Sequence, residues 1–342
     1  MTLPRPADLP PSGPDDRASG APPVPPEVVA LARSRAEARA VSDWTTADRL
    51  RGAIEASGWR IVDDGLAFRL TPAHPPDRRD GPVVRYGAST AVPSRLVEPA
   101  DREASVVLLA TDGPADLARA LSGLRSAAPD RTQLVVVADD PGPDLEAGLA
   151  ALPADAEQEI IMTATRLGPG AALACGLRRC RGSVVILLDP SLEPEGDIVG
   201  PLRTGLADPA VGVAGSPGLV ASDLRRFSEA PAGEVDAIAG CLAFRRFDLT
   251  ARGPLDERFH TRHSLEIWWS LVLRDEGPGR APRRALAIDL PILRHEAGPR
   301  SAVAQAGQER LERRDVYRLM DRFGKRTDLL RAPGPARPRR AR

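Results

Sequence analysis

Acidic side chains follow two strongly apolar runs and are the first candidates for chemistry. Asp139 and Asp140 come directly after QLVVVA, and Asp189 comes directly after SVVILL. Side chains two residues apart share one side of an extended segment, so Asp189, Ser191 and Glu193 line up if the chain stays extended there. The plainer alternative is a turn at Asp139-Asp140, where Pro-Gly-Pro follows, and a strand that merely ends at Asp189 beside a solvated Glu193.

A single acid beside two tryptophans forms the second candidate. Glu266 precedes Trp268 and Trp269 in LEIWWSLVL, a segment that we interpret as a helix. One carboxylate is enough to take a proton from a hydroxyl group, and an aromatic wall beside it suits a sugar or an aromatic acceptor. The alternative is core packing. We expect one tryptophan to pack in the core and the other to line a pocket.

Three histidines are candidates of lower specificity. His295 follows the strand-like run ALAIDLPIL, and a neutral imidazole there could bind a metal ion; a histidine with ordinary hydrogen-bond partners is the alternative. His260 and His263 flank Arg262 in HTRH and lack partners at metal-ligand spacing. We therefore interpret them as residues of an acceptor loop, a loop that contacts the molecule whose hydroxyl group would react.

The elements that position these residues alternate in type along the chain. The expected strands are 105–110, 133–139, 159–165 and 183–189, and the expected helices are 115–128, 142–152 and 170–180. Such alternation predicts a doubly wound, mostly parallel α/β sheet. Ligands of these sheets lie beyond the carboxyl ends of the strands. This rule predicts that a ligand would lie beside residues 111–112, 139–140, 166–170 and 189–193.

The organisation of the chain follows from its composition. Residues 1–26 are rich in Pro, Gly and Asp and are expected to be disordered. Residues 27–72 predict a helical hairpin and a small β-hairpin, with helical spacing of Trp44, Ala47, Leu50 and Ile54. The Pro- and Arg-rich stretch 73–102 is expected to be a linker, 103–330 the main domain, and 331–342 a basic disordered tail.

Charge and cysteine content exclude several classes of protein. Lys+Arg and Asp+Glu both total 47, so the chain has no overall basic field for nucleic acid. The three cysteines are odd in number and lack metal-site spacing, which is typical of reduced thiols in a cytoplasmic protein. The longest apolar run, VVILL, is far shorter than the ~20 residues that span a bilayer. Peripheral membrane association remains compatible with this composition.

The segment RLGPGAALACGLRRCRGSVVILLDPSLEP (166–194) resembles the part of family 2 glycosyltransferases that leads into their metal-binding DxD motif. VDAIAGCLAFRR, GPLDERF, LEIWWSLVLRDEG and LPILRHE follow in the order of later landmarks of that family. The resemblance covers about 225 residues in register, which chance matches to single motifs rarely produce. It implies a GT-A-type fold and a glycosyltransferase of the hexosyltransferase type.

The same resemblance implies a metal site. Transfer from a nucleotide sugar leaves a charged diphosphate, which such enzymes usually neutralise with Mn²⁺ or Mg²⁺. The DxD motif is altered here to Asp189-Pro190-Ser191, and Glu193 could supply the missing carboxylate. The resemblance therefore implies Asp189, Glu193 and His295 as metal ligands.

Roles for other residues also follow from the resemblance. Donor-binding roles fall to Asp139, Arg166, Gly168 and Asp189. Glu266 stands at the place of the catalytic base, although Ile267 replaces the second acid of the usual Glu-Asp pair. Trp268, Trp269 and Asp256 are assigned to the acceptor pocket.

Residues 33–70 separately resemble the C-terminal helical module of cysteinyl-tRNA synthetases, which contacts tRNA in that family. The synthetase's catalytic motifs and zinc cysteines are absent from the sequence, so aminoacylation is not implied. A docking or packing hairpin is favoured over retained tRNA binding.

Three functions remain open on the sequence. The favoured one is transfer of a sugar from a nucleotide-sugar donor to an unknown acceptor hydroxyl, with inversion at the sugar carbon. A non-catalytic GT-A-like module that binds a nucleotide or a protein partner would explain the altered residues Ser191 and Ile267. An RNA-associated protein that acts through residues 27–72 is the third.

Overall fold

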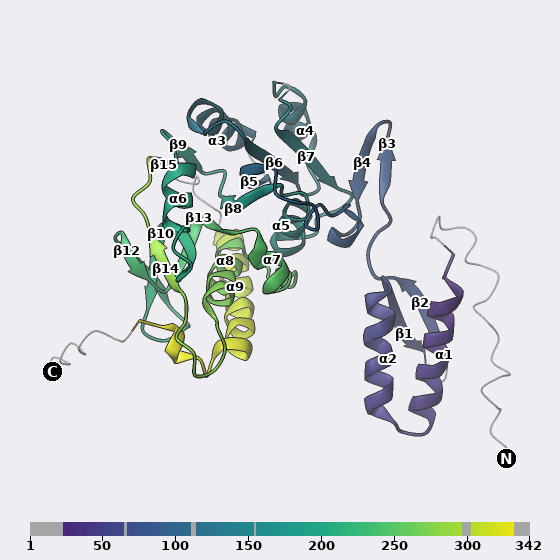
Figure 1. Ribbon diagram of the computed structural model, residues 1–342. Helices are drawn as coiled ribbons and strands as arrows, with labels where there is room; N and C mark the ends of the chain where they lie inside the picture. Colours follow the sequence, from purple (N-terminus) through teal and green to yellow (C-terminus); the bar gives the residue numbers. More distant parts are fainter. Residues whose placement is uncertain (1–22, 65–66, 111–113, 154, 296–301, 332–342) are drawn as a thin grey trace, which may run out of the picture. The chain divides into compact units, whose positions relative to one another are not determined.

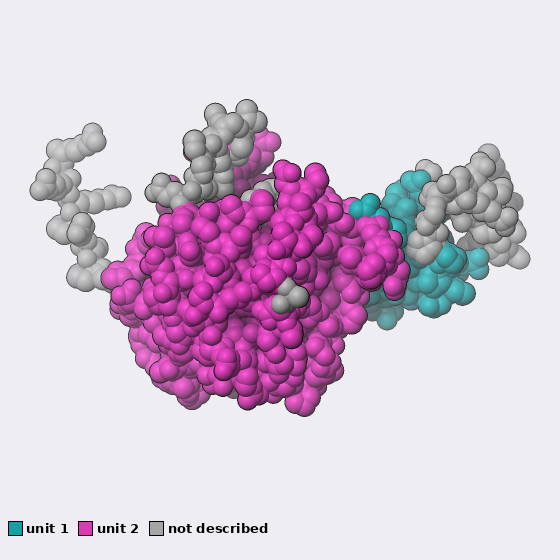
Figure 2. Space-filling view, turned by 90° about the horizontal axis from the view of Figure 1, so that it is seen from above, with its two compact units in different colours: residues 1–78 teal, residues 79–342 magenta. Residues whose placement is uncertain are grey.

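The computed structural model describes residues 23–64, 67–110, 114–153, 155–295 and 302–331. The chain divides into two compact units, Met1–Arg78 and Arg79–Arg342, which Figure 2 shows in teal and magenta. In the described ranges no helix is both long and apolar enough to cross a membrane. The expected disorder of residues 1–26 and 331–342 concerns segments that lie almost entirely outside the described residues.

The first unit is a helical hairpin followed by a β-hairpin. Helices α1 (Pro26–Ala40) and α2 (Trp44–Ala56) precede the antiparallel strands β1 (Trp59–Asp64) and β2 (Ala67–Pro72). The Asp43 carboxylate caps α2 by accepting a hydrogen bond from the Thr46 amide at 3.0 Å. Val28, Ala32, Ile54, Trp59 and Ile61 form its core, whereas Trp44, expected on the apolar face, is exposed.

The second unit is built on one mixed sheet with a parallel centre (Figure 1). Its central order is β8-β5-β6-β7-β4, and the neighbouring pairs in this run are parallel. The antiparallel strand β13 continues the sheet beside β8, followed by β10, β14 and β12. The strands are β5 (Arg102–Ala110), β6 (Thr132–Ala138), β7 (Gln158–Thr163), β8 (Gly182–Leu188), β10 (Val211–Ala221), β11 (Phe227–Ala230), β12 (Gly233–Val235), β13 (Ala237–Arg245) and β14 (Arg284–Ala287). The expected doubly wound, mostly parallel α/β fold is confirmed.

Alternation along the buried strands creates two cores, one on each face of the sheet. On β5, Val107 and Leu109 face one core, whereas Val106 and Leu108 face the other. Helices α5 (Pro169–Leu177), α8 (Arg262–Arg274) and α9 (Ala302–Phe323) belong to the first core, and α3 (Pro114–Ala127), α4 (Pro143–Ala150) and α6 (Val199–Gly205) belong to the second. The short helix α7 (Phe247–Ala251) follows β13. Helix α9 lies beside α8 (Figure 1).

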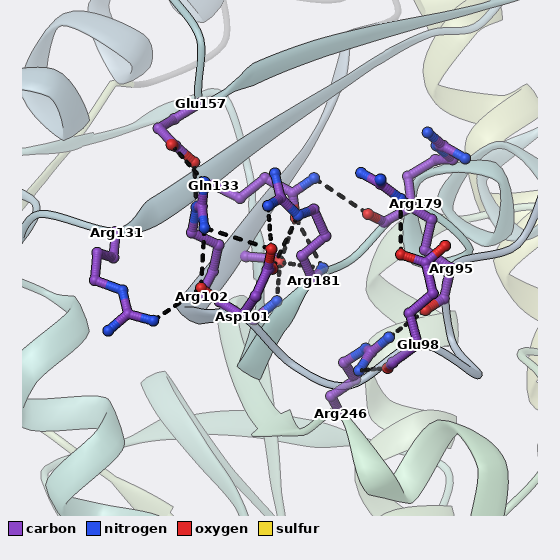
Figure 3. A network of polar contacts seen from close by, with 12 residues as sticks. Arg95, Glu98, Asp101, Arg102, Arg131, Gln133, Glu157, Arg179, Arg181 and Arg246 are labelled. Carbon is purple, nitrogen blue, oxygen red and sulfur yellow. Dashed lines mark hydrogen bonds and ion pairs between the residues drawn. The ribbon is translucent and has the colours of Figure 1, made fainter.

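Residues 73–102 differ from the expected linker. This stretch forms β3 (Arg78–Asp80) and β4 (Val83–Tyr86), and β4 pairs in parallel with β7 at the edge of the main sheet. Ion pairs and hydrogen bonds hold residues 95–102 in place at the amino ends of the central strands (Figure 3). Asp101 pairs with Arg181, and the Arg246 guanidinium donates to the carbonyl of Glu98 at 2.9 Å. A short strand that pairs with a distant segment leaves little local pattern, so composition alone was misleading here.

Candidate functional site

Asp189, Arg262 and Glu266 meet around the backbone of Gly240, just beyond the carboxyl end of β8. The Gly240 carbonyl accepts a hydrogen bond from the Asp189 amide at 2.8 Å, and the Gly240 amide donates to Glu266 Oε2 at 2.8 Å. Gly240 lies on β13 with a φ of 81°, a value that favours glycine. The backbone of this one residue therefore links the end of β8 to the N-terminal part of α8.

Arg262 joins the two carboxylates. Its Nε donates to Glu266 Oε1 at 2.7 Å and lies 3.8 Å from Asp189 Oδ2. Arg262 and Glu266 are four residues apart on α8, so they lie on the same face of the helix. The Glu266 side chain is 2% exposed, and both of its oxygens accept hydrogen bonds from the chain itself.

The guanidinium of Arg262 partly compensates the negative charges of Asp189 and Glu266, because it lies between the two carboxylates. Burial opposes the charge of Arg262, but Glu266 and Asp189 outweigh that effect and raise the pKa of the guanidinium. Burial also opposes ionisation of Asp189, yet the charge of Arg262 and the hydrogen bonds from Ser191 hold the pKa of this carboxyl below its usual range. Asp189 is therefore an anion at neutral pH.

The three side chains line a cavity of about 470 Å³. The segment 189–192 after β8, strands β10, β11 and β13, helix α8 and Arg294 contribute to its wall. The lining residues are Asp189, Ser191, Leu192, Pro217, Leu219, Phe227, Glu229, Ala239, Gly240, Arg262, His263, Glu266 and Arg294. The volume lies within the range of small-molecule sites, and the wall combines apolar side chains with the Asp189, Arg262 and Glu266 group and the Arg294–Glu229 ion pair.

The three expected metal ligands do not form one group. Glu193 lies on β9 (Leu192–Pro194), which pairs with β15 (Ile292–Arg294), and its Oε2 lies 2.6 Å from His295 Nε2. Neither Glu193 nor His295 lines the cavity. Within the described part of the chain, no three His, Cys, Asp or Glu side chains gather closely enough to hold a metal ion.

The residues present at Asp189 do not fit a divalent cation. Asp189 Oδ1 accepts hydrogen bonds from the Ser191 amide at 2.9 Å and hydroxyl at 2.7 Å, while Arg262 faces Oδ2. Two unit charges 4 Å apart near a protein surface interact by roughly 4 kcal/mol, and the repulsion doubles for a divalent ion beside a guanidinium. Arg262 therefore opposes a metal at the oxygen that a metal would need.

The expected donor-binding residues have unequal positions. Asp139 is 1% exposed, and its carboxylate accepts hydrogen bonds from the Leu167 and Gly168 amides and the Thr163 hydroxyl at 2.8–2.9 Å. It therefore fixes the loop before α5 and presents little surface to a ligand. Gly168 has a φ of 87° and precedes the first turn of α5, and Arg166 is exposed in the same loop. None of these three residues lines the cavity.

The expected acceptor-pocket residues lie elsewhere, and the expectation for the tryptophans is corrected. Trp268 is 4% exposed and Trp269 is fully buried, and neither lines the cavity. Helix α8 is covered by the sheet on one side and by α9 on the other, and Arg322 of α9 stacks over the Trp268 ring at 5.0 Å. Asp256 is paired with Arg258 at 2.8 Å, which stabilises its own loop.

Two residues that position the site were not identified from the sequence. Arg262 was noted only as a neighbour of two histidines, although its spacing to Glu266 is a signal for a helical ion pair. Asp315 of α9 is completely buried and accepts hydrogen bonds from the amides of His260 and Thr261 at 2.8–3.1 Å. It also accepts one from the Thr261 hydroxyl at 2.9 Å and so anchors the residues directly before Arg262.

Known proteins show the same kind of domain. Residues 105–252 match the family model described as "Glycosyl transferase family 2". A crystal structure of GalNAc-T7 with UDP, GalNAc and Mn²⁺ has a TM-score of 0.50 and 15% identity, and the alignment covers 64% of this chain and 48% of that one. The domain is therefore similar to family 2 glycosyltransferases in sequence and has a GT-A fold, as the landmarks from residue 166 onward indicated.

Other similarities are more limited. The structure of the mannosyltransferase PcManGT from Pyrobaculum calidifontis, in complex with GDP-Man and Mn²⁺, has a TM-score of 0.44 and 16% identity. The alignment covers 67% of this chain and 69% of the PcManGT chain. Cysteine–tRNA ligase 1 of Burkholderia lata is 54% identical over 47 residues, which are 14% of this chain and 10% of the ligase. The chain thus spans a tenth of that curated relative and about half of the GalNAc-T7 chain. The short match to the ligase confirms the expected likeness to this class of protein.

Proposed function

We propose that the second unit is an inverting glycosyltransferase whose donor binds in the cavity at Asp189, Arg262 and Glu266. The observation that carries this proposal is the position of the cavity. It lies beyond the carboxyl end of β8 in a GT-A fold and is lined by the acid at the altered DxD motif and the acid expected as the base. Sheets of this type bind their ligands at that edge.

In the proposed reaction, Glu266 takes the proton of an acceptor hydroxyl. The hydroxyl oxygen forms a bond to the anomeric carbon of the donor sugar, and the bond from that carbon to the diphosphate oxygen breaks. The electron pair of the broken bond leaves with the nucleoside diphosphate. Arg262 and the Gly240 amide keep the Glu266 carboxylate oriented, so the chain's own residues position the base before the acceptor arrives.

A non-catalytic nucleotide-binding module is the second candidate. It is favoured by the same hydrogen bonds, because both oxygens of Glu266 are engaged by the chain and Ile267 supplies no second acid. This candidate keeps the cavity as a donor site but gives Glu266 only a structural role. Binding of a donor supports both candidates, whereas turnover supports only the transferase.

Donor binding is tested by thermal melting of the full chain with UDP-, GDP- and dTDP-sugars, each measured in EDTA and in Mn²⁺. A ligand at 100 times its dissociation constant stabilises the native state by about 2.7 kcal/mol. For a domain of this size, that shifts Tm by roughly 5–10 °C. We expect one nucleotide to produce the shift and Glu193→Gln to retain it. Asp189→Ala should lose most of it, because this variant removes a charged partner that holds Arg262 in the cavity wall. A panel in which no sugar nucleotide changes Tm under either condition would contradict the proposal.

A further inference from the structure

The cation beside Asp189 belongs to the chain itself. Arg262 Nε is hydrogen-bonded to Glu266 Oε1 at 2.7 Å, its Nη2 lies 3.4 Å from the Gly240 carbonyl, and its side chain is 14% exposed. A guanidinium so placed is fixed between two carboxylates and cannot be displaced without leaving the buried Glu266 unpaired.

The remaining nitrogen of this guanidinium, Nη1, has no hydrogen-bond partner among the residues that the structure describes. It is buried, although other atoms of Arg262 line the cavity. Buried donors are nearly always satisfied, so Arg262 keeps a hydrogen-bond capacity that no described group of the chain uses. A planar guanidinium is well suited to the oxygens of a phosphate.

Anchors on two sides hold Arg262 in this position. Thr261 caps α8, and the buried Asp315 binds the amides of His260 and Thr261. The acids at its other side are held too, because Ser191 orients Asp189 and Gly240 orients Glu266. The arrangement is thus fixed from four elements: the end of β8, Gly240 in β13, the start of α8 and Asp315 of α9.

We propose that Arg262 is the resident cation of this cavity and takes the place of a divalent metal, so that the cavity binds the diphosphate of its donor without metal. The exclusion of a divalent metal by Arg262 does not depend on the proposed glycosyltransferase function. The binding of the donor diphosphate without metal rests on that function. The charge needed next to a leaving diphosphate is then supplied by a side chain that is covalently part of the enzyme.

Metal exclusion is tested by titrating Mn²⁺ into the full chain and following free Mn²⁺ by electron paramagnetic resonance. The wild type should bind Mn²⁺ no more tightly than Asp189→Asn does. Arg262→Ala should gain a site at least ~10-fold tighter than in the wild type, because a unit positive charge about 4 Å from Asp189 is removed. Arg294→Ala is the matched control. It also removes a cavity arginine, but one whose ion-pair partner is the exposed Glu229 and whose charge acts on Asp189 less strongly than that of Arg262, so any gain should be clearly smaller.

Three results would overturn the inference. One is a wild-type Mn²⁺ site that Asp189→Asn abolishes, another is an equal gain in Arg262→Ala and Arg294→Ala, and the third is nucleotide binding that requires Mn²⁺. Arg262→Ala leaves Glu266 buried without a cation and could fail to fold; the comparison of wild type with Asp189→Asn decides the question without it. A chain that binds no nucleotide under any condition loses the proposed function, while the Mn²⁺ titration still decides the role of Arg262.

Discussion

Replacing Glu266 with glutamine should lower kcat for sugar transfer by about 10²–10⁴-fold, the usual contribution of a positioned general base. Glutamine keeps the length of the side chain and can still accept a hydrogen bond from the Gly240 amide or from Arg262, so the cavity wall is preserved. It cannot take a proton from the acceptor. The donor dissociation constant should change by less than about 3-fold, because the variant removes an interaction of the transition state and little ground-state binding.

A structural role of Glu266 would give a different pattern. If Glu266 only orients Arg262, the variant should weaken donor binding and alter Tm while its pH profile keeps the shape of the wild type. If Glu266 is the base, the acidic limb of the kcat/KM profile should disappear in Glu266→Gln. Glu193→Gln is the matched control, since Glu193 pairs with His295 outside the cavity lining. Unchanged kcat in Glu266→Gln would remove this residue from the mechanism.

Replacing Asp315 with alanine should lower the free energy of unfolding by about 2–5 kcal/mol. The carboxylate is completely buried and accepts the amide hydrogens of His260 and Thr261 as well as the Thr261 hydroxyl. Each buried donor left without an acceptor costs about 1–3 kcal/mol. The loss is measured as a shift of the urea midpoint at an unchanged slope.

Asp321→Ala is the matched control for this prediction. Asp321 lies on the same helix and is exposed, so its replacement should change stability by no more than about 0.5 kcal/mol. Because Asp315 fixes the residues before Arg262, its replacement should also weaken donor binding, whereas Asp321→Ala should not. Equal unfolding midpoints for the two variants would show that Asp315 does not anchor this loop.

The local sequence pattern was sufficient to predict the parallel half of the fold. It predicted the other elements and the contacts of the site much less well. The strands before Asp139 and Asp189 are continuous apolar runs, which fully buried strands require, and their ends place both acids at the carboxyl edge of the sheet. The partners of those acids depend on tertiary contacts. Nothing in the sequence near Asp139 shows that its carboxylate turns onto the amides of Leu167 and Gly168.

The residues around α8 show the same limit. The two tryptophans indicate a buried or binding helix equally well, and only the position of α9 against α8 decides for burial. Asp315 is one charge within ERLERRDVYRLMDRF, and helical spacing does not reveal which acid of that run is buried. Arg262 differs from Asp315, because its four-residue spacing to Glu266 can be recognised in the sequence as that of a helical ion pair. An arginine-rich chain makes that signal easy to overlook.

The most direct test of the account is donor turnover by the full chain in EDTA. UDP-, GDP- and dTDP-sugars are incubated with the wild type and with Glu266→Gln, and the nucleoside diphosphate released is measured against a panel of hydroxyl acceptors. We predict that the wild type releases one nucleoside diphosphate without added metal and that Glu266→Gln releases at least ~100-fold less. Release that is equal in the two proteins, or absent from the wild type in both EDTA and Mn²⁺, would contradict the assignment of this cavity as a glycosyltransferase site.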